Sequence, residues 1–431
     1  MGDDRQRIAR RTVLTGTALG AAALAVAPAQ AAQAARSASS AREAGPGAAR
    51  PRPRGKVTAR PLANADGSHP LVLLRDVSRS GQVLGMLDLG DGAADRWPDA
   101  VWADGTVTVL QSPVAGASCN AVSVNDLGQA AGDHVVAGRQ TATVWTGGEP
   151  RVLDIGTLYS TATAVNNLGQ VAVRGWNEQG GETATWNTVC LVDGDTVTTV
   201  TPPASANGMG LHAQGVDDSG GVLVVGFRPQ SGDRAAFLWR DGAVVADFSH
   251  IDGYPSYFGL QGVAGPNTRG DVAGDYYPAV SGGGPLPRGF LWAAGALHDV
   301  PGLGGGNAMV TLFGGRPLND LGDVVGCTDL GSGVRHPFLL SGGSSTDLGT
   351  LGGTSAHPVA VNNRREVAGD STLSDGTTRA FLWRSGGTTA ITPPQGYATT
   401  SAFGLTEQGQ VIGQAVTADG SAAGYFAWTV A

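Results

Sequence analysis

The chain has 431 residues, with 36 acidic and 28 basic groups, 68 glycines and three cysteines. This glycine content excludes an architecture of long helices, because each glycine costs a helix about 1 kcal/mol relative to alanine. The cysteines are too few for a disulfide framework and lack the spacing of a metal site. Residues 61–431 hold 17 basic and 33 acidic groups, a net charge of −16. Because such a body repels polyphosphates, we expect no nucleic-acid partner.

The first 35 residues have the pattern of an export signal. Arg10-Arg11 precedes residues 12–35, which carry no charge and are rich in alanine, glycine and leucine. The uncharged run is long enough to span a membrane. Its alanine and glycine content and small-residue sites such as Ala29-Gln30-Ala31 favour cleavage instead. We therefore predict a twin-arginine signal peptide over residues 1–35, a secreted protein and no stable membrane insertion.

The next segment, residues 36–55, consists mainly of alanine, proline, arginine, serine and glycine. A segment of this composition cannot bury a core, so we predict a disordered linker. The folded domain should then comprise residues 56–431.

From residue 71 onward one phrase recurs about eight times. Its first landmark is a turn position, found at Gly81, Gly128, Gly169, Gly220, Gly270, Gly322, Arg365 and Gly409. Its second is the end of an apolar run, found at Trp102, Trp145, Trp186, Trp239, Trp292, Leu340, Trp383 and Trp428. The turn positions lie 41 to 52 residues apart, a period typical of propeller blades.

The chemistry inside each copy also favours strands. Asn125-Asp126-Leu127-Gly128 places turn formers between two apolar runs, as in a hairpin with a bulge. Ala236-Phe237-Leu238-Trp239 is apolar throughout, as expected of a strand buried on both faces. We predict an all-β propeller of about eight four-stranded blades, with seven blades as the alternative. A β-solenoid or an array of sandwiches would be the other interpretations of the period.

The ends of the chain predict how the ring closes. The last copy stops at Ala431, before a fourth strand, while residues 56–62 precede the first copy and read as a strand without a partner. A ring with an open edge would expose unpaired backbone groups. We therefore predict that residues 57–60 complete the last blade.

These phrases resemble the extracellular repeat family named after a His-Ala-Phe triplet, the HAF repeats, over roughly residues 71–428. Leu348–Ala356 and Asp299–Gly306 match the family's Leu-Gly-x-Leu-Gly-Gly portion. In place of the triplet the chain has Arg379-Ala380-Phe381, Arg288-Gly289-Phe290 and His336-Pro337-Phe338. The resemblance implies a secreted repeat protein and no defined activity, so it supplies no catalytic residue.

No catalytic motif stands out. The chain has no His-Glu-x-x-His, no Gly-x-Ser-x-Gly and no phosphate-binding loop. Its seven histidines are scattered, and we interpret the acidic loop at Asp88, Asp91 and Asp95 as solvated rather than as a calcium site. Cys119, Cys190 and Cys327 are interpreted as free thiols, with a Cys119–Cys190 bridge as the alternative. We expect no metal and no cofactor.

One aromatic cluster is the candidate binding site. Connections between blades and connections between the second and third strands of a blade should open on the same face. Four of the seven tyrosines fall on such connections, and tyrosine suits sugar rings or peptide anchors. The predicted site residues are Tyr254, Tyr257, Tyr276, Tyr277, Asp252, Asp275 and Arg288. The alternative is that these rings pack between two blades.

The sequence thus predicts a secreted binding or interaction module for a glycan, a cell-wall component or a protein, acting as a monomer. The alternative is an extracellular hydrolase or lyase acting on polysaccharide or peptidoglycan. An enzyme would need carboxylates or histidines that converge near the ring axis. Because no such set is visible, we favour a protein without catalytic activity.

Overall fold

The computed structural model describes residues 56–89, 97–177, 187–249, 260–277, 286–305, 307–311 and 315–431. The predicted signal peptide and linker, together with Asp91, Asp95 and Trp186, lie outside these residues. The described part is built from strands, and its helix is confined to two 3-10 turns, η2 (Ala204–Ala206) and η3 (Leu303–Gly305). No helix within these residues has the length and apolar character needed to cross a membrane.

The first four repeat copies each form a four-stranded antiparallel sheet whose strands pair in chain order. Copy 1 has β2 (Leu71–Val77), β3 (Val83–Leu87), β4 (Asp99–Ala103) and β5 (Thr106–Val109), and copy 2 has β6 (Ser118–Val124), β7 (Ala130–Val136), β8 (Arg139–Thr146) and β9 (Glu149–Val152). Copy 3 has β10 (Tyr159–Val165), β11 (Val171–Trp176), β12 (Thr188–Asp193) and β13 (Thr196–Thr199), and copy 4 has β14 (Gly210–Val216), β15 (Val222–Arg228), β16 (Asp233–Arg240) and β17 (Ala243–Asp247).

The later copies follow the same plan with two departures. Copy 5 has β18 (Leu260–Ala264), β19 (Val272–Tyr276), β20 (Arg288–Ala293) and β21 (Ala296–Val300), and copy 6 has β22 (Val324–Asp329), β23 (Arg335–Ser341) and β24 (Ser344–Asp347). Copy 7 has β25 (Gly352–Val361), β26 (Val367–Leu373), β27 (Thr378–Arg384) and β28 (Gly387–Ala390), and copy 8 has β29 (Thr399–Leu405), β30 (Val411–Val416) and β31 (Ala423–Val430). In copy 6, isolated bridges at Met309 and Leu318 stand in for a full first strand.

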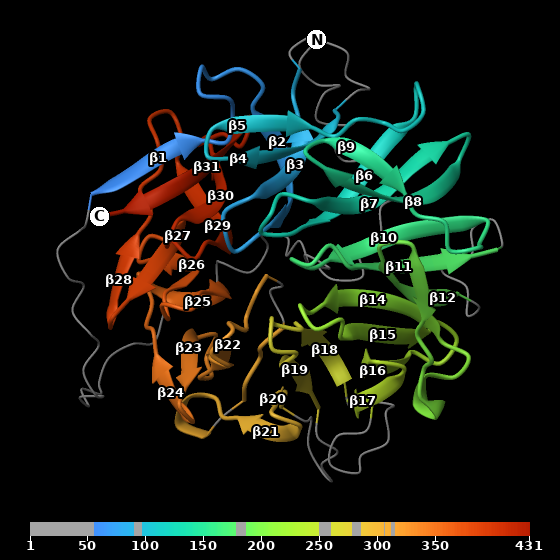
Figure 1. Ribbon diagram of the computed structural model, residues 1–431. Coiled ribbons are helices and arrows are strands. Elements are labelled where there is room, and N and C mark those ends of the chain that lie inside the picture. The colour runs from blue at the N-terminus through green and yellow to red at the C-terminus, as the bar shows by residue number, and fades with distance from the viewer. Residues whose placement is uncertain are drawn as a thin grey trace. The chain divides into compact units, whose positions relative to one another are not determined.

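The outer position of copy 8 is taken by β1 (Val57–Pro61), which pairs antiparallel with β31. Val57 lies opposite Val430 and Pro61 opposite Phe426. Figure 1 shows this blue strand beside the red end of the chain. Segments 365 to 373 residues apart in sequence therefore share one sheet.

Packing between copies follows a circular order. Each of eight hydrophobic clusters joins residues of two successive copies. One of them contains Leu71 and Trp102 of copy 1 together with Ile412 and Ala427 of copy 8. Each sheet is thus buried on both faces, as in the ring of sheets seen in Figure 1. The chain is a β-propeller.

The number of blades depends on how copies 6 and 7 are counted. Among the described residues there are seven sheets, because a single parallel bridge between Arg335 and Ser355 joins the strands of copies 6 and 7 into one. Counting the repeat copies gives eight blades, whereas counting the hydrogen-bonded sheets gives seven.

The turn that opens each copy has the predicted geometry. The N–H of Gly128 donates to Asn125 O, and the N–H of Asn125 donates to Gln129 O, as in a hairpin with a glycine bulge. All eight landmark positions have positive φ, including Arg365 at 61°. A glycine adopts this conformation without steric cost, which explains its use in seven copies.

The asparagine at the start of these turns also links neighbouring copies. Asn125 Nδ2 donates to Asn166 O, and Asn319 Nδ2 donates to Asn362 O, at 2.8 and 2.9 Å. We call this series of bonds the asparagine ladder; its other donors are Asn166, Asn267 and Asn362. Asp217 interrupts the ladder because a carboxylate cannot donate, and it pairs with Arg240 instead. The recurring asparagine is therefore a structural residue.

The predicted tryptophan position at the end of the apolar run, the tryptophan slot, is confirmed in the described copies except copy 3. Trp239 and Trp383 are buried, as predicted, in clusters between successive copies. The slot residue pairs with the first residue of the second strand, for example Trp145 with Ala130. In copy 3 the residue in that register is Val192, not Trp186. The placement of Trp186 in the slot was therefore wrong, because Val192 occupies the position opposite Val171.

Candidate functional site

The predicted tyrosine site is described only in part. Tyr254, Tyr257 and Asp252 lie outside the described residues. Tyr276, at the end of β19, is 5 % exposed, and its ring centroid lies 6.4 Å from that of Phe290 within the cluster between copies 4 and 5. Tyr276 therefore packs between two blades, which was the alternative to a role in ligand binding.

Asp275 is likewise part of the contact between sheets. Its carboxylate accepts hydrogen bonds from the N–H of Val310 at 2.5 Å, from the N–H of Thr311 at 2.7 Å and from the hydroxyl of Thr311 at 2.6 Å. Burial raises the pKa of Asp275 and these donors lower it, with burial the stronger effect. Of the remaining predicted residues, Tyr277 is half-buried and Arg288 is exposed, 4.0 Å from Asp299.

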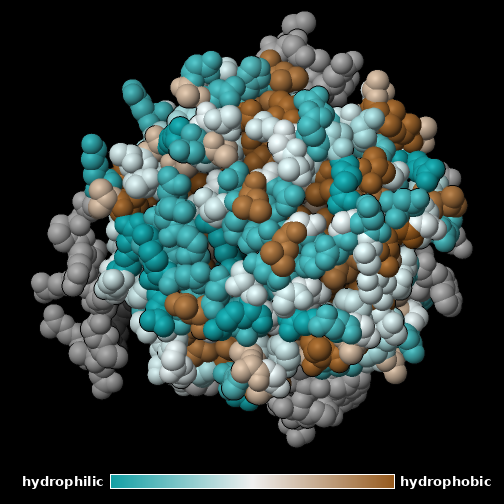
Figure 2. Space-filling view, viewed as in Figure 1, coloured by the Kyte–Doolittle hydropathy of each residue, from teal (hydrophilic) through white to brown (hydrophobic). Residues whose placement is uncertain are grey.

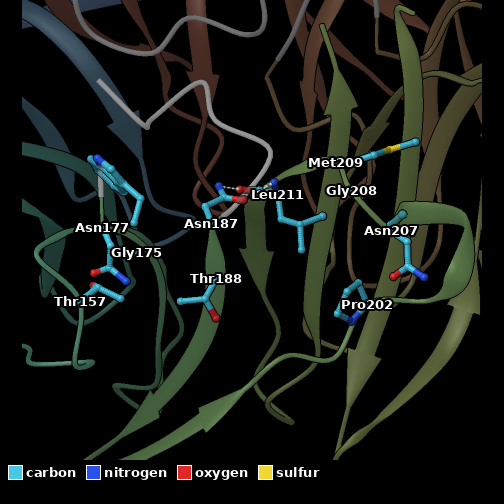
Figure 3. Close-up of a pocket in the computed structure, with 12 residues that line it drawn as sticks. Thr157, Gly175, Asn177, Asn187, Thr188, Pro202, Asn207, Gly208, Met209 and Leu211 are labelled. Carbon is cyan, nitrogen blue, oxygen red and sulfur yellow. Dashed lines mark hydrogen bonds between the residues drawn. The ribbon is translucent and has the colours of Figure 1, made fainter. Parts of the chain in front are cut away.

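A pocket lies instead between copies 3 and 4. It has a volume of about 300 Å³ and is bordered by the β11–β12 and β13–β14 connections. Its lining residues are Thr157, Gly175, Trp176, Asn177, Asn187, Thr188, Pro202, Ala206, Asn207, Gly208, Met209 and Leu211. Figure 3 shows Thr157, Gly175 and Asn177 on one side, Pro202 and Asn207 on the other, and Asn187 and Thr188 between them. None of the lining residues that the structure describes has an ionisable side chain.

The aromatic part of the lining is held in place. Trp176 stacks on Tyr159 with 5.9 Å between ring centroids and 10° between planes. The Arg174 guanidinium lies 4.9 Å from the centre of the Trp176 ring, within the range of a cation–π contact. These two contacts hold the indole, which is 3 % exposed.

The three amide side chains of the lining differ in their freedom. Asn187 donates to Leu211 O at 2.5 Å and accepts from Leu211 N at 2.6 Å, so its polar atoms are already used (Figure 3). Asn177 Oδ1 accepts from the N–H of Leu158. The exposed Asn207 side chain makes no hydrogen bond to another described residue. Asn207 is therefore the amide most open to a ligand.

Local sequence explains why the space exists. A Cβ at position 175 would lie 2.5 Å from Thr157 Oγ1, so only glycine allows the β9–β10 connection to approach there. Pro202-Pro203 leads into η2, and Gly208 turns the chain with a φ of 71°. The signal that sequence reasoning missed was Trp176, a tryptophan outside the repeat slot.

Buried carboxylates form a second group, near the first strands of copies 1 and 2. Arg75 Nε lies 3.2 Å from Asp99 Oδ1, and Asn120 connects Arg75 to Asp133 through hydrogen bonds of 2.9 and 3.2 Å. Burial raises the pKa of Asp99 and of Asp133 to about 6. Both side chains are 1 % exposed or less, so they cannot contact a polymer bound at the surface.

A histidine–carboxylate pair lies in copy 7. His357 Nε2 is 3.8 Å from Asp370 Oδ2, beyond hydrogen-bond length. Burial lowers the pKa of His357 to about 4 and raises that of Asp370 to about 7. Both groups are therefore uncharged between these pKa values, so the pair does not act as an ion pair there.

Thiols and metals offer little chemistry in the described part of the chain. The three cysteines are free, so the alternative of a Cys119–Cys190 bridge is not formed, and burial raises the pKa of Cys327 to about 12 and of Cys119 to about 11. Such thiols are not reactive nucleophiles. Within the described ranges, no group of histidine, cysteine and acidic side chains has the geometry to hold a metal ion.

Comparisons with known proteins concern the fold alone. No protein-family model matches the chain, and a search of curated proteins gave no relative. The chain is similar to the β-propeller domain of the Trilobed protease from Pyrococcus furiosus, with 12 % identity, a TM-score of 0.45, and 83 % of this chain and 95 % of that one covered.

Two further solved structures are similar at lower scores. An acylaminoacyl peptidase from Pyrococcus horikoshii has 11 % identity and a TM-score of 0.42 over 80 % of this chain and 57 % of its own. The BP39L lectin from Burkholderia pseudomallei has 14 % identity and a TM-score of 0.33 over 70 % of this chain and 92 % of its own.

Proposed function

We propose that this chain is an exported binding module that takes a neutral, hydroxyl-rich ligand the size of one or two sugar rings in the pocket between copies 3 and 4. The observation that carries the proposal is a pocket whose lining includes an exposed amide without a hydrogen-bond partner among the described residues, Asn207, and a largely buried indole, Trp176.

The composition of the lining favours a neutral ligand. A carboxamide both donates and accepts hydrogen bonds, as a sugar hydroxyl does, whereas an ionic ligand would need a charged partner. The lining residues that the structure describes carry no ionisable side chain, and the apolar ones among them, Trp176, Met209 and Leu211, are each 5 % exposed or less. A volume of about 300 Å³ is at the small end of ligand pockets, which limits the ligand to a compact unit.

Rigid walls should improve affinity. Asn187 is held at both polar atoms by the backbone of Leu211, and Trp176 is held by Tyr159 and Arg174. Ordering side chains on binding costs roughly 0.5–1.5 kcal/mol for each flexible group. A ligand that meets groups already fixed avoids most of this cost.

The surface is consistent with recognition in a pocket rather than across a large apolar interface. On the face shown in Figure 2, hydrophobic residues occur as separate spots among hydrophilic ones. Contiguous exposed apolar patches are the usual mark of a protein-binding surface.

Hydrolysis is the weaker candidate. A hydrolase acting on a polymer needs carboxylates that reach the substrate. The aspartates whose pKa is raised by burial, Asp99, Asp133, Asp275 and Asp370, are all buried among the described residues.

The test is a screen of the purified protein on a glycan and cell-wall fragment array, followed by titration of the best ligand. Asn207→Ala should weaken binding by about 1–2 kcal/mol, roughly 5- to 30-fold, through loss of a ligand hydrogen bond. The matched control is Gln395→Ala in the corresponding connection after copy 7. Gln395-Gly396 follows Thr392-Pro393-Pro394 directly, whereas Asn207-Gly208 follows Thr201-Pro202-Pro203 after three further residues.

Two results would contradict the proposal. One is an array without any binder at millimolar glycan. The other is a bound glycan that Asn207→Ala and Gln395→Ala hold as tightly as the unmodified protein. In the second case the predicted tyrosine site, with Tyr254 and Tyr257, becomes the next surface to test.

Export by the twin-arginine route is a separate part of the proposal. It is supported by Arg10-Arg11 and the uncharged run that follows. Replacing both arginines by lysine should keep the protein inside the producing cell, while the same change at Arg5 and Arg7 should not. Equal secretion of both double variants would contradict this route.

A further inference from the structure

We propose that Asn207 is a site of spontaneous deamidation, and that Arg228 accelerates the reaction. Asn207-Gly208 is the chain's only Asn-Gly sequence. Glycine leaves the backbone nitrogen after an asparagine unshielded, so this nitrogen can attack the neighbouring side-chain amide. The chemistry needs only water and does not depend on the binding function proposed above.

The surroundings of Gly208 leave room for the attack. Asn207 and Gly208 are both exposed. A Cβ added at Gly208 would meet only Arg228 Nη2, at 4.0 Å. Within the described residues the Asn207 side chain and the N–H of Gly208 make no hydrogen bonds that the attack would have to break. The peptide plane must turn from the observed ψ of 132°, which an exposed loop before glycine permits.

Arg228 contacts the peptide group that reacts. Its Nη2 donates to Asn207 O at 2.7 Å, and Asn207 O and the nitrogen of Gly208 belong to the same peptide bond. A cationic donor on the oxygen withdraws electron density from the nitrogen and makes its N–H more acidic. More of the nitrogen is then present in the deprotonated form that attacks. Arg228 is itself held by Asp233, with 2.6 Å between Nη1 and Oδ2.

Deamidation at Asn207 would proceed through a cyclic imide. The nitrogen of Gly208 loses its proton and bonds to Asn207 Cγ, the Cγ–Nδ2 bond breaks, and ammonia leaves with that proton. The cyclic imide that results takes up one water molecule at either carbonyl. The ring opens to aspartate or to isoaspartate, and no oxidant or reductant takes part.

The product changes the pocket. Deamidation replaces an amide by a carboxylate next to the Arg228 guanidinium, where the other described lining residues carry no ionisable group. Isoaspartate also adds a carbon to the backbone between η2 and β14. If the pocket binds a neutral sugar, which rests on the proposed function, aged protein should bind it less tightly than fresh protein.

The experiment follows the native protein during incubation at mildly alkaline pH, with peptide mass spectrometry and isoaspartate detection. The Asn207 peptide should convert to a mixture of aspartate and isoaspartate, while the Gln395-Gly396 peptide of the corresponding loop stays unchanged. Arg228→Gln should lower the rate roughly tenfold, the effect of removing one charge-assisted hydrogen bond. Arg234→Gln is the matched control, because Arg234 contacts Gln261 O rather than this loop.

A denatured sample separates structure from sequence. In urea, the unmodified protein and Arg228→Gln should deamidate at the same rate. The proposal is overturned if Asn207 persists as long as Gln395, if Arg228→Gln matches the unmodified native protein, or if the two still differ when denatured. None of these readouts uses a ligand, so they are independent of the binding screen.

Discussion

Asn166 offers the sharpest test of how the blades are held together. Its side chain is 4 % exposed and makes four hydrogen bonds. Nδ2 donates to Asp217 O in the next copy and to Gln170 Oε1, both at 2.7 Å. Oδ1 accepts from the N–H groups of Leu168 and Gln170 at 3.1 and 2.9 Å. Asn166→Ala removes all four bonds at once.

The expected loss is about 3–4 kcal/mol, taking roughly 1 kcal/mol for each hydrogen bond. Asn166→Asp keeps the two acceptor bonds and loses both donors, so it should cost about 2 kcal/mol. The chain itself carries aspartate at the corresponding position 217, where Arg240 provides a cation that copy 3 lacks.

Urea unfolding followed by tryptophan fluorescence measures these differences. Leu168→Ala is the control, because this side chain lies in the same turn but is 67 % exposed. Its change should stay within about 0.5 kcal/mol. If Asn166→Ala is no more destabilising than Leu168→Ala, the asparagine ladder does not contribute to stability and the reasoning fails.

Three further predictions concern the core, the ends and the pH dependence. Trp239→Ala should cost about 3–5 kcal/mol in thermal unfolding, because the side chain is 2 % exposed between copies 3 and 4; an unchanged Tm would contradict its place in the core. Deleting residues 57–61 should lower the Tm by exposing the edge of β31, whereas deleting residues 36–50 should not, and equal effects would argue against this role of β1. Burial raises the pKa of Asp370 from 3.8 to about 7, so the folded state keeps a proton that the unfolded state releases. Its contribution to stability is therefore complete below pH 3.8 and is lost as the pH rises to about 7. Asp370→Asn should flatten that loss in urea titrations at several pH values, and a profile identical to the unmodified protein would refute the assignment.

The fold could be predicted from the sequence because its causes are local and repeated. A turn at Asn125–Gly128 needs only its own residues, and an apolar run such as Ala236–Trp239 is buried wherever it is placed. Eight copies of the same signals make the interpretation robust to a departure in one copy, as with Arg365 in the glycine position. At Trp186 the repeated pattern misleads, because an aromatic residue close to the expected position is the slot residue only if it pairs with the first residue of the second strand, as Val192 does.

The pocket could not be predicted because only the tertiary structure decides it. Its walls come from connections that the repeat does not constrain, and the space depends on Gly175 admitting Thr157 of the preceding connection. Tertiary packing likewise determines whether the predicted site residues are accessible to a ligand. The sequence predicts Asp275 and Tyr276 in a connection after a strand, but they are the last two residues of β19. Packing against the neighbouring copies buries both, Tyr276 towards copy 4 and Asp275 towards copy 6. Neighbouring residues therefore determine the strands, the turns and the spacing of the repeat. Whether a side chain is accessible to a ligand depends instead on residues distant in the chain.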